Sequence, residues 1–314
     1  MLRLLRFADL DLARWAACVA ASPGALPYVE AWWLAATAGR WDAVVELGPT
    51  GEYHSLLPLP TKWRPWGRAA YQPLFTQQLG LVLTPASECR QLADYVSVAK
   101  KYVSRFYQQL PTGAPLSEMP PVFILGQRLT YHLDLTPGAD ALRLAYAADY
   151  RRRLRKNEAA PQPLRVSEGA NIEELIQLFL TYKSADHTGL RPGQYAALCR
   201  LAAAAQERGA AELRQVRHPA TGELLAGALF IRHAGGLIYL FAVASAAGRA
   251  SGAPLLLLDD AVGRHAGQPG QLLDFEGGSL PGIGRFFANF GARPVAYPTL
   301  AFTRTTWLSL WMRP

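Results

Sequence analysis

The spacing of hydrophobic residues predicts a mixture of strands and helices in the first half of the chain. Short apolar or alternating runs between turn residues are typical of strands, and apolar residues three or four positions apart are typical of a helix. We predict strands at residues 2–7, 41–47, 53–60, 68–84 and 130–135, and helices at 9–22, 26–39 and 88–110. The helix at 88–110 rests on Leu92, Tyr95, Val96, Ala99, Val103 and Phe106.

The second half predicts a strand meander followed by alternating helices and strands. Three consecutive strand patterns, at residues 211–218, 223–233 and 237–245, are separated by short glycine-containing turns, which is typical of antiparallel neighbours. The other predicted elements are helices at 138–158, from Asn171, and at 192–209, 254–266 and 281–290, and strands at 164–166, 272–277 and 292–302. Both halves favour an α/β fold of the mixed α+β kind, each with a largely antiparallel sheet flanked by helices.

Length and composition favour two globular domains. The chain has 314 residues, more than one core usually holds, and half of them are hydrophobic. The longest charge-free run, residues 69–87, contains several glutamines, whereas a membrane span needs about 20 mostly apolar residues. Asp9, Asp11 and Arg14 interrupt the apolar N-terminus. We therefore expect neither a cleaved signal peptide nor an integral membrane segment.

Cysteine and histidine usage predicts no disulfide framework and no metal site. Cys18, Cys89 and Cys199 are odd in number and far apart, and the six histidines show no metal-ligand spacing. We expect a reduced, cytoplasmic compartment.

The net charge of +8 is partly concentrated in Tyr150–Lys156, which holds five basic residues in seven. This run is either a solvated helix face or an anion site for cofactor phosphates, a nucleotide-linked substrate or RNA. No aromatic residues are interleaved around it, so it gives little support to sequence-specific reading of nucleic acid.

Three segments carry a resemblance to a known family. They read LPLPTKWRPWGRAAYQPLFTQQLGL at residues 57–81, DYRRRLRKN at 149–157, and LLDFEGG followed by GIGRFFANFGA at 272–292. In these segments the chain resembles the GNAT superfamily of N-acyltransferases, and more narrowly its double-domain branch, the Fem-type aminoacyl and peptidyl transferases. The resemblance runs from about Tyr28 to Thr299. It implies two tandem GNAT-like domains, at residues 1–136 and 137–314, the first degenerate and the second the acyltransferase domain.

The resemblance implies an acyl-CoA donor, acetyl-CoA or a longer one, at residues 243–262. There a strand leads through a small-residue loop into a helix, whose N-terminal N–H groups and dipole suit a pyrophosphate. The GNAT motif Gln/Arg-x-x-Gly-x-Gly/Ala matches Arg249 to Ala253, with Pro254 at its last position. The donor-binding residues expected on this basis are Val243, Arg249, Ser251, Gly252 and Ala253. A turn without a ligand remains the alternative.

Glu276 is the candidate catalytic residue. An amine attacks a carbonyl only when it is neutral, and a carboxylate at a partly apolar strand end can serve as its general base. Gly277 and Gly278 leave room for a substrate backbone to approach. The alternative role for Glu276 is to fix the fold by accepting hydrogen bonds.

Two positions depart from the family pattern. Many GNAT enzymes protonate the leaving thiolate with a tyrosine after this strand, and no tyrosine lies between Leu272 and Ala296. Fem-like relatives often carry a lysine where Phe287 stands, so a muramyl-peptide or tRNA substrate is less strongly implied. Phe287 is nevertheless a candidate substrate contact.

The acceptor is expected in a groove between the two domains. The resemblance assigns acceptor contacts to Lys62, Arg64, Tyr71 and Gln72, and we add Arg151 and Gly277 as candidates. Their chemistry suits a small-molecule or a sugar- or nucleotide-linked amine. The open alternatives are an aminoacyl-tRNA donor in a Fem-like transferase, a non-catalytic module with the same fold, and RNA binding through Arg151–Lys156.

Overall fold

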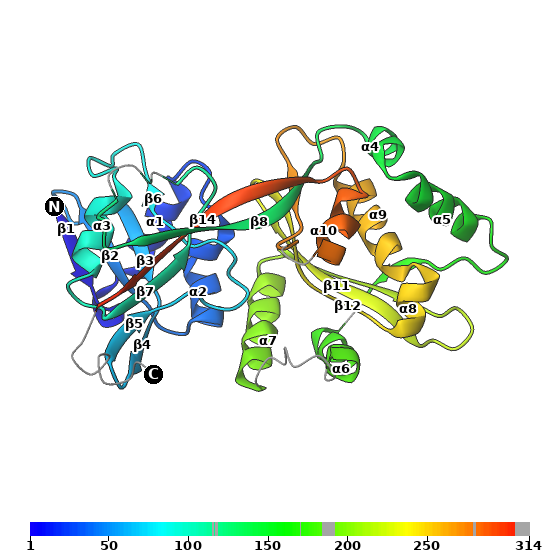
Figure 1. The fold of residues 1–314 in the computed structure, drawn as a ribbon, viewed down its shortest axis with the longest axis horizontal. Coiled ribbons are helices and arrows are strands. Elements are labelled where there is room, and N and C mark those ends of the chain that lie inside the picture. Colours follow the sequence, from blue (N-terminus) through cyan, green and yellow to red (C-terminus); the bar gives the residue numbers. More distant parts are fainter. Residues whose placement is uncertain (115, 117–118, 170, 184–191, 279–280, 305–314) are drawn as a thin grey trace. The chain divides into compact units, whose positions relative to one another are not determined.

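The computed structural model describes residues 1–114, 116, 119–169, 171–183, 192–278 and 281–304. The chain forms two compact units (Figure 1): an N-terminal unit, Met1–Arg128 with the segment from Ala296 onward, and a C-terminal unit, Leu129–Val295. The chain passes between the units within strands β8 (Ile124–Asp134) and β14 (Arg293–Thr303). The division into independent domains at residues 136 and 137 stays a prediction.

The N-terminal unit contains two groups of hydrogen-bonded strands. The first has the order β1-β2-β3-β6, and the second has the order β4-β5-β7-β14. The bounds are β1 Leu2–Leu5, β2 Asp42–Leu47, β3 Tyr53–Leu59, β4 Thr61–Arg64, β5 Gly67–Ala70, β6 Val82–Leu83, β7 Arg105–Gln109, α1 Leu12–Ala20, α2 Ala31–Thr37, α3 Leu92–Ala99, and 3-10 turns at Phe7–Asp9 and Pro27–Val29.

The strands β2 and β3 are apolar on both faces because helices cover both. Val45 and Leu56 belong to the core that contains Trp15 of α1, whereas Val44 and Leu57 belong to the core that contains Tyr95 of α3. A strand buried on both sides loses the usual alternation of apolar and polar residues. This explains the nearly continuous apolar runs in the sequence.

The long helix predicted at residues 88–110 is wrong in its second half. Helix α3 ends at Ala99, and β7 begins at Arg105. In β7, Phe106 and Gln108 are buried while Arg105 and Tyr107 are exposed. Apolar residues at positions 99, 103, 106 and 110 fit a helix, but the alternation around Phe106 fits a strand equally well, and the pairing of β7 with β5 and β14 selects the strand.

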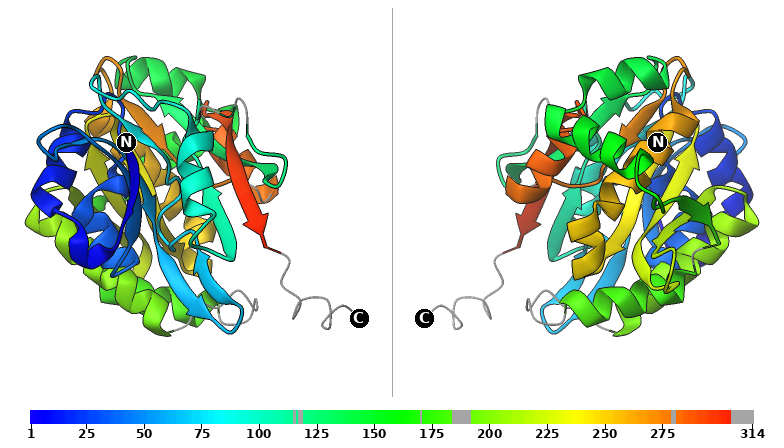
Figure 2. Two further views of the ribbon diagram at one scale, coloured as in Figure 1. Left: turned by 90° about the vertical axis from the view of Figure 1, so that its left-hand side faces the viewer. Right: turned by 90° about the vertical axis from the view of Figure 1, so that its right-hand side faces the viewer.

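The C-terminal unit is a mixed sheet with helices on both faces (Figures 1 and 2). Its strand order is β8-β13-β12-β11-β10-β9, and only β12–β13 pairs in parallel among the pairs described. Its elements are α4 Ala139–Ala145, α5 Ala148–Glu158, β9 Val166–Glu168, α6 Ile172–Lys183, α7 Pro192–Glu207, β10 Ala211–Arg217, β11 Leu224–His233, β12 Gly236–Ala244, α8 Ala246–Ser251, α9 Ala253–His265, β13 Leu272–Asp274 and α10 Pro281–Ala288. The predicted mixed sheet flanked by helices is confirmed.

Two predicted elements of this unit differ from the structure. The helix expected at 138–158 is divided into α4 and α5 at Tyr146–Ala147. The loop expected between β12 and the next helix is largely α8, which Ser245 caps by accepting a hydrogen bond from the Gly248 N–H. Gly252 then turns the chain into α9 with a left-handed φ of 85°, a conformation that glycine adopts at little cost.

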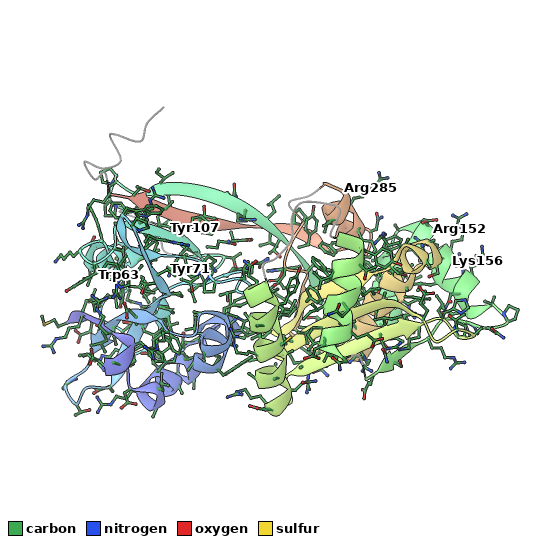
Figure 3. All side chains as sticks on the ribbon, turned by 90° about the horizontal axis from the view of Figure 1, so that it is seen from below. Trp63, Tyr71, Tyr107, Arg152, Lys156 and Arg285 are labelled. Carbon is green, nitrogen blue, oxygen red and sulfur yellow. The ribbon has the colours of Figure 1, made fainter. Side chains whose placement is uncertain are left out.

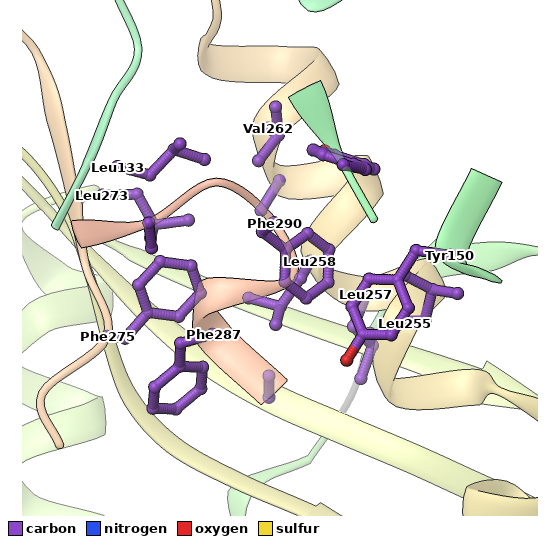
Figure 4. Close-up of a cluster of buried hydrophobic side chains, with 14 of the residues drawn as sticks. Leu133, Tyr150, Leu255, Leu257, Leu258, Val262, Leu273, Phe275, Phe287 and Phe290 are labelled. Carbon is purple, nitrogen blue, oxygen red and sulfur yellow. The ribbon is translucent and has the colours of Figure 1, made fainter. Parts of the chain in front are cut away.

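Phenylalanines that follow β13, or lie in α10 or just after it, fill the core beside α9 (Figure 4). Phe275 and Phe287 stack with ring centroids 4.5 Å apart, and Phe290 is fully buried against Tyr150 of α5. Burying one such side chain contributes about 1.5–3 kcal/mol to stability. Phe287 of α10 and Phe290 just after it are buried, whereas Ile283 is 40% exposed.

Two ion-pair clusters fix α9 along its length. Asp259 is buried and is held by two hydrogen bonds from the guanidinium of Arg143 on α4. At the end of α9, Arg264 and His265 both contact Glu212 of β10. Burial alone would raise the pKa of Glu212, but the hydrogen bonds from His265 and Arg264 outweigh it and lower the pKa to about 2.

We predict that Glu212 stabilises the protein at neutral pH and that this contribution is lost in acid. A carboxyl whose folded-state pKa is depressed stabilises the fold above its unfolded pKa, and this stability is lost as the pH falls. The difference in unfolding free energy between the wild type and Glu212→Gln should reach about 3 kcal/mol above pH ~5 and shrink towards pH ~2. Urea unfolding across that range measures it, with the exposed Glu207→Gln as control. A difference that does not change with pH would contradict the prediction.

Candidate active site

Strands β12 and β13 separate after only three paired residues. Their parallel pairing ends at Ile238 opposite Asp274, while β12 continues to Ala244. Among the described residues, no strand pairs with this edge of β12 beyond Ile238. The backbone of β12 therefore presents unpaired peptide groups along residues 239–244, and we call the point of separation the fork.

A bulge at the fork turns neighbouring side chains of β12 to opposite faces of the sheet. Phe230 pairs with Tyr239 and Leu229 with Phe241, so Leu240 is the extra residue. Such a bulge bends a strand and redirects its side chains. Accordingly, the Phe241 ring lies 5.4 Å from Phe179 of α6, whereas the Tyr239 ring lies 6.3 Å from Phe287 of α10.

A cavity of about 620 Å³ occupies the opening beside β12. Residues of β12, α6, α8, α9 and α10 line it, together with one residue of α5. Because α6 and α10 contact opposite faces of the sheet, the cavity lies in the gap between the diverging strands. The predicted donor residues Val243, Arg249 and Gly252 and the predicted substrate contact Phe287 all line this cavity.

Two arginines lie where α8 meets α9. Arg249 donates to the Ala244 carbonyl at 2.7 Å, and its guanidinium lies 5.9 Å from the Tyr182 ring. Arg153 of α5 lies close to Gly252 and lines the same cavity. The N-terminus of α9 adds its positive dipole end, although Pro254 has no N–H to offer. This end of the cavity is suited to an anion.

Glu276 follows β13 just beyond the fork and is not among the residues that line the cavity. Leu273 and Phe275 point into the core, and Asp274 and Glu276 alternate with them and are only partly buried. Glu276 has a left-handed φ of 51°, which is uncommon for a residue with a side chain and often marks a functional site.

A polar cluster maintains the turn at Glu276. The Glu276 N–H donates to Asp274 Oδ1 at 2.9 Å, and Thr130 Oγ1 donates to the same oxygen at 2.5 Å. His132 Nε2 lies 3.3 Å from Asp274 Oδ2. The side chain of Asp274 thus replaces a backbone partner, as in an Asx turn. Glu276, between an apolar strand and two glycines, therefore lies in a turn that these hydrogen bonds hold in one conformation.

The glycines after Glu276 differ in what surrounds them. A side chain at Gly278 would overlap the ring of Tyr131, and Gly278 also has a φ of 118°. Tyr131 therefore takes the space that a side chain at Gly278 would need, and the approach of a substrate backbone there stays a prediction. At Gly277 a Cβ would meet only the Phe275 carbonyl oxygen, 3.9 Å away, so this position is open.

Other predicted site residues have structural partners. Ser251 donates to the Gly248 carbonyl, and Ala253 is fully buried in the core. Arg151 lies with Asp140 and Arg155 in a separate groove formed by α4 and α5. On a helix, residues two apart point to nearly opposite sides, so Arg153 reaches the cavity and Arg151 does not.

In the N-terminal unit, Lys62 forms a cation–π pair with Tyr71, which is labelled in Figure 3, and the ammonium lies 3.8 Å from the ring centre. Burial, and then the charge of Arg64, lowers the pKa of Lys62. Arg64 lies in the exposed β4–β5 hairpin, which also carries Trp63. Gln72 donates to the Thr76 carbonyl and accepts from the Gln109 N–H, so its amide is committed to the fold.

Sequence reasoning missed Arg153, Tyr182 and Tyr239, which line the cavity. The run RRRLRK could have been divided by helical phase, because Tyr150 and Leu154 mark its buried side and Arg153 adjoins it. No comparable signal existed for Tyr239, whose position depends on the bulge. Among the described residues, no group of acidic, histidine or cysteine side chains could hold a metal ion, and no helix is long and apolar enough to cross a membrane.

Comparison with known proteins supports the same interpretation. A family model described as an acetyltransferase (GNAT) domain matches residues 145–281. The crystal structure of FemX superposes with a TM-score of 0.65 at 13% identity, covering 98% of each chain. A tandem GNAT protein from the clavulanic acid biosynthesis pathway gives a TM-score of 0.55 at 14% identity, covering 98% of this chain and 99% of that one. No curated protein sequence matches.

A third structure has the same fold. The C-terminal domain of a putative lysylphosphatidylglycerol synthetase from Agrobacterium fabrum gives a TM-score of 0.53 at 12% identity, covering 96% of this chain and 94% of that one. The tandem-domain fold and the acyltransferase class predicted from the sequence are confirmed. Residues 145–281 thus match a GNAT acetyltransferase domain, and the chain as a whole has the tandem-domain fold that FemX and the tandem GNAT protein share.

Proposed function

We propose that this protein transfers an acyl group from acyl-CoA to an amine, with the donor in the cavity beside β12. One observation carries the proposal: a single cavity has two arginines and a helix N-terminus at one end and follows the free edge of β12 to Tyr239, the first residue beyond the fork. Acyl-CoA has the matching order of parts, with phosphates at one end, an arm containing two amides, and a thioester.

The phosphates of the donor would lie against Arg153 and Arg249. Charge-assisted hydrogen bonds from guanidinium groups to phosphate are strong, and they replace the backbone donor that Pro254 removes. The amides of the arm would pair with the free edge of β12, as an added strand does. Residues 239–244 span about 17 Å at 3.3 Å per residue, a length comparable with the extended arm.

The reaction requires a neutral amine and a stabilised oxyanion. Glu276 would take the proton of the amine, whose nitrogen then attacks the thioester carbonyl. Peptide N–H groups of β12 near the bulge would stabilise the oxyanion. The new C–N bond forms, the C–S bond breaks, and the sulfur leaves with the bonding electrons. It then takes up a proton, so that the products are the amide and free CoA.

Several acceptors and donors fit this chemistry. Gly277 leaves space beside Glu276 for an amine, and the sugar- or nucleotide-linked acceptor expected from Lys62 and Tyr71 stays a prediction. An aminoacyl-tRNA donor is the second candidate, because α5 also exposes Arg152, Arg155 and Lys156 to solvent (Figure 3). A steep loss of tRNA binding with rising salt would favour this donor.

We predict that Arg153→Ala and Arg249→Ala each weaken acetyl-CoA binding about tenfold, since each removes a charge-assisted contact to phosphate. Calorimetric titration with acetyl-CoA measures this. Arg152→Ala, on the same helix but paired with Asp149 at the surface, should bind as the wild type does. S-acetylpantetheine lacks the nucleotide and the phosphates, so the variants should not discriminate against it. Equal losses for both donors would mean that the arginines act only on the fold.

We predict that Glu276→Gln lowers turnover by about 10²–10⁴-fold while acetyl-CoA affinity stays unchanged, because only proton removal is lost. Release of free thiol with a panel of primary amines measures turnover. Amines of low basicity should be affected least, since they are already neutral. The exposed Glu223→Gln serves as control. A uniform loss of both affinity and folding stability would instead make Glu276 a purely structural residue.

A further inference from the structure

We propose that Tyr239 donates a hydrogen bond to the sulfur that leaves the acyl donor. The inference rests on the proposed function and adds a residue to it. The proposed reaction releases a thiolate inside the cavity, and the segment after β13 carries no tyrosine that could stabilise it. A hydroxyl group from another element can supply the missing donor.

Tyr239 lies at the place that the thioester would occupy. It is the first residue of β12 after the last parallel pair, Ile238 opposite Asp274. Glu276 follows Asp274 by two residues, so Tyr239 and Glu276 are carried by the two segments that diverge at the fork. The phosphate end of the cavity, at Gly252, lies towards the opposite end of β12. A donor held by its phosphates there would direct its thioester towards the fork.

The ring of Tyr239 is held in place on several sides. Its centroid lies 5.2 Å from Phe230, 6.3 Å from Phe275 and 6.3 Å from Phe287. The bulge at Leu240 sets which face of the sheet the ring occupies. Fixed donors stabilise developing charge well because they need no reorganisation when the reaction occurs. The aromatic contacts fix the ring of Tyr239, so this residue meets the condition without a hydrogen bond that holds its hydroxyl group.

The hydroxyl of Tyr239 is available to a ligand. Tyr239 lines the cavity and is only partly buried, and among the described residues its hydroxyl has no hydrogen-bond partner. Burial raises its pKa, so the group stays protonated and remains a donor. Because its pKa lies above that of a thiol, Tyr239 stabilises the thiolate by a hydrogen bond and keeps its own proton. The sulfur receives its proton afterwards, from water or from protonated Glu276.

The first experiment measures the ionisation of the thiol of bound CoA and needs no acceptor. The ultraviolet absorbance of the thiolate is followed against pH in complexes of CoA with the wild type and with Tyr239→Phe. Loss of the donor should raise the pKa of the bound thiol by about one unit, equivalent to 1.36 kcal/mol. Arg153, Arg249 and Tyr182, which line the cavity, and Glu276 beyond the fork are the same in both proteins and cancel in the comparison.

The matched control is Tyr150→Phe. It also removes one partly buried hydroxyl, but that hydroxyl donates to the Phe286 carbonyl, and Tyr150 does not line the cavity. Its CoA complex should show the thiol pKa of the wild type. Because Tyr239→Phe keeps the aromatic ring, CoA affinity and unfolding midpoint should stay close to those of the wild type.

The second experiment is steady-state turnover of acetyl-CoA with an accepted primary amine. Tyr239→Phe should lower kcat about 10–100-fold with little change in the KM for acetyl-CoA, because the hydrogen bond forms only as sulfur becomes charged. An unchanged thiol pKa and an unchanged kcat, with CoA still bound, would overturn the role of Tyr239 and leave the proposed function standing. A wild type that binds neither CoA nor acetyl-CoA would overturn both.

Discussion

The parallel pairing of β12 with β13 over only three residues is the constraint on which the site depends. Parallel strands in one sheet need a crossover connection, and here that connection is α8 and α9, which line the cavity. Because pairing stops at Ile238 and Asp274, the edge of β12 is left free where a ligand can pair with it. A longer β13 would close the gap and pair the peptide groups that the proposed donor needs.

Most of the surrounding structure prevents the gap from closing. The bulge at Leu240 bends β12 away, and the left-handed turn at Glu276, held by Asp274, bends the other segment. Phe275 and Phe287 fill the wedge between the sheet and α10, and α9 is held in place by Asp259 and Glu212. Each of these contacts also contributes to stability, so the opening of the cavity is a consequence of how the core is packed.

The sequence predicted what depends on local pattern and missed what depends on pairing. The meander β10–β12, helix α9 and the position of Glu276 at a strand end follow from hydrophobic spacing and glycine placement. The strand β7 was mistaken for the end of a helix because its apolar spacing fits both periods. Tyr239 was not identified because a one-residue bulge decides which face of the sheet it occupies, and bulges have no strong sequence signal. The contact of Gly278 with Tyr131 could not be predicted because the two residues are distant in sequence.

The two departures from the family pattern are related through the same geometry. Pro254 lacks the N–H group that could bind a phosphate at the start of α9. Arg153 lies beside Gly252, where its guanidinium can supply a hydrogen-bond donor instead. The segment after β13 lacks a tyrosine, and Tyr239 lies across the fork from it. In both cases the substitute comes from an element that faces the same cavity from another direction. In a site built from β12, α5 and α10, a required side-chain group can therefore come from a different element while the proposed acyl donor keeps the same position.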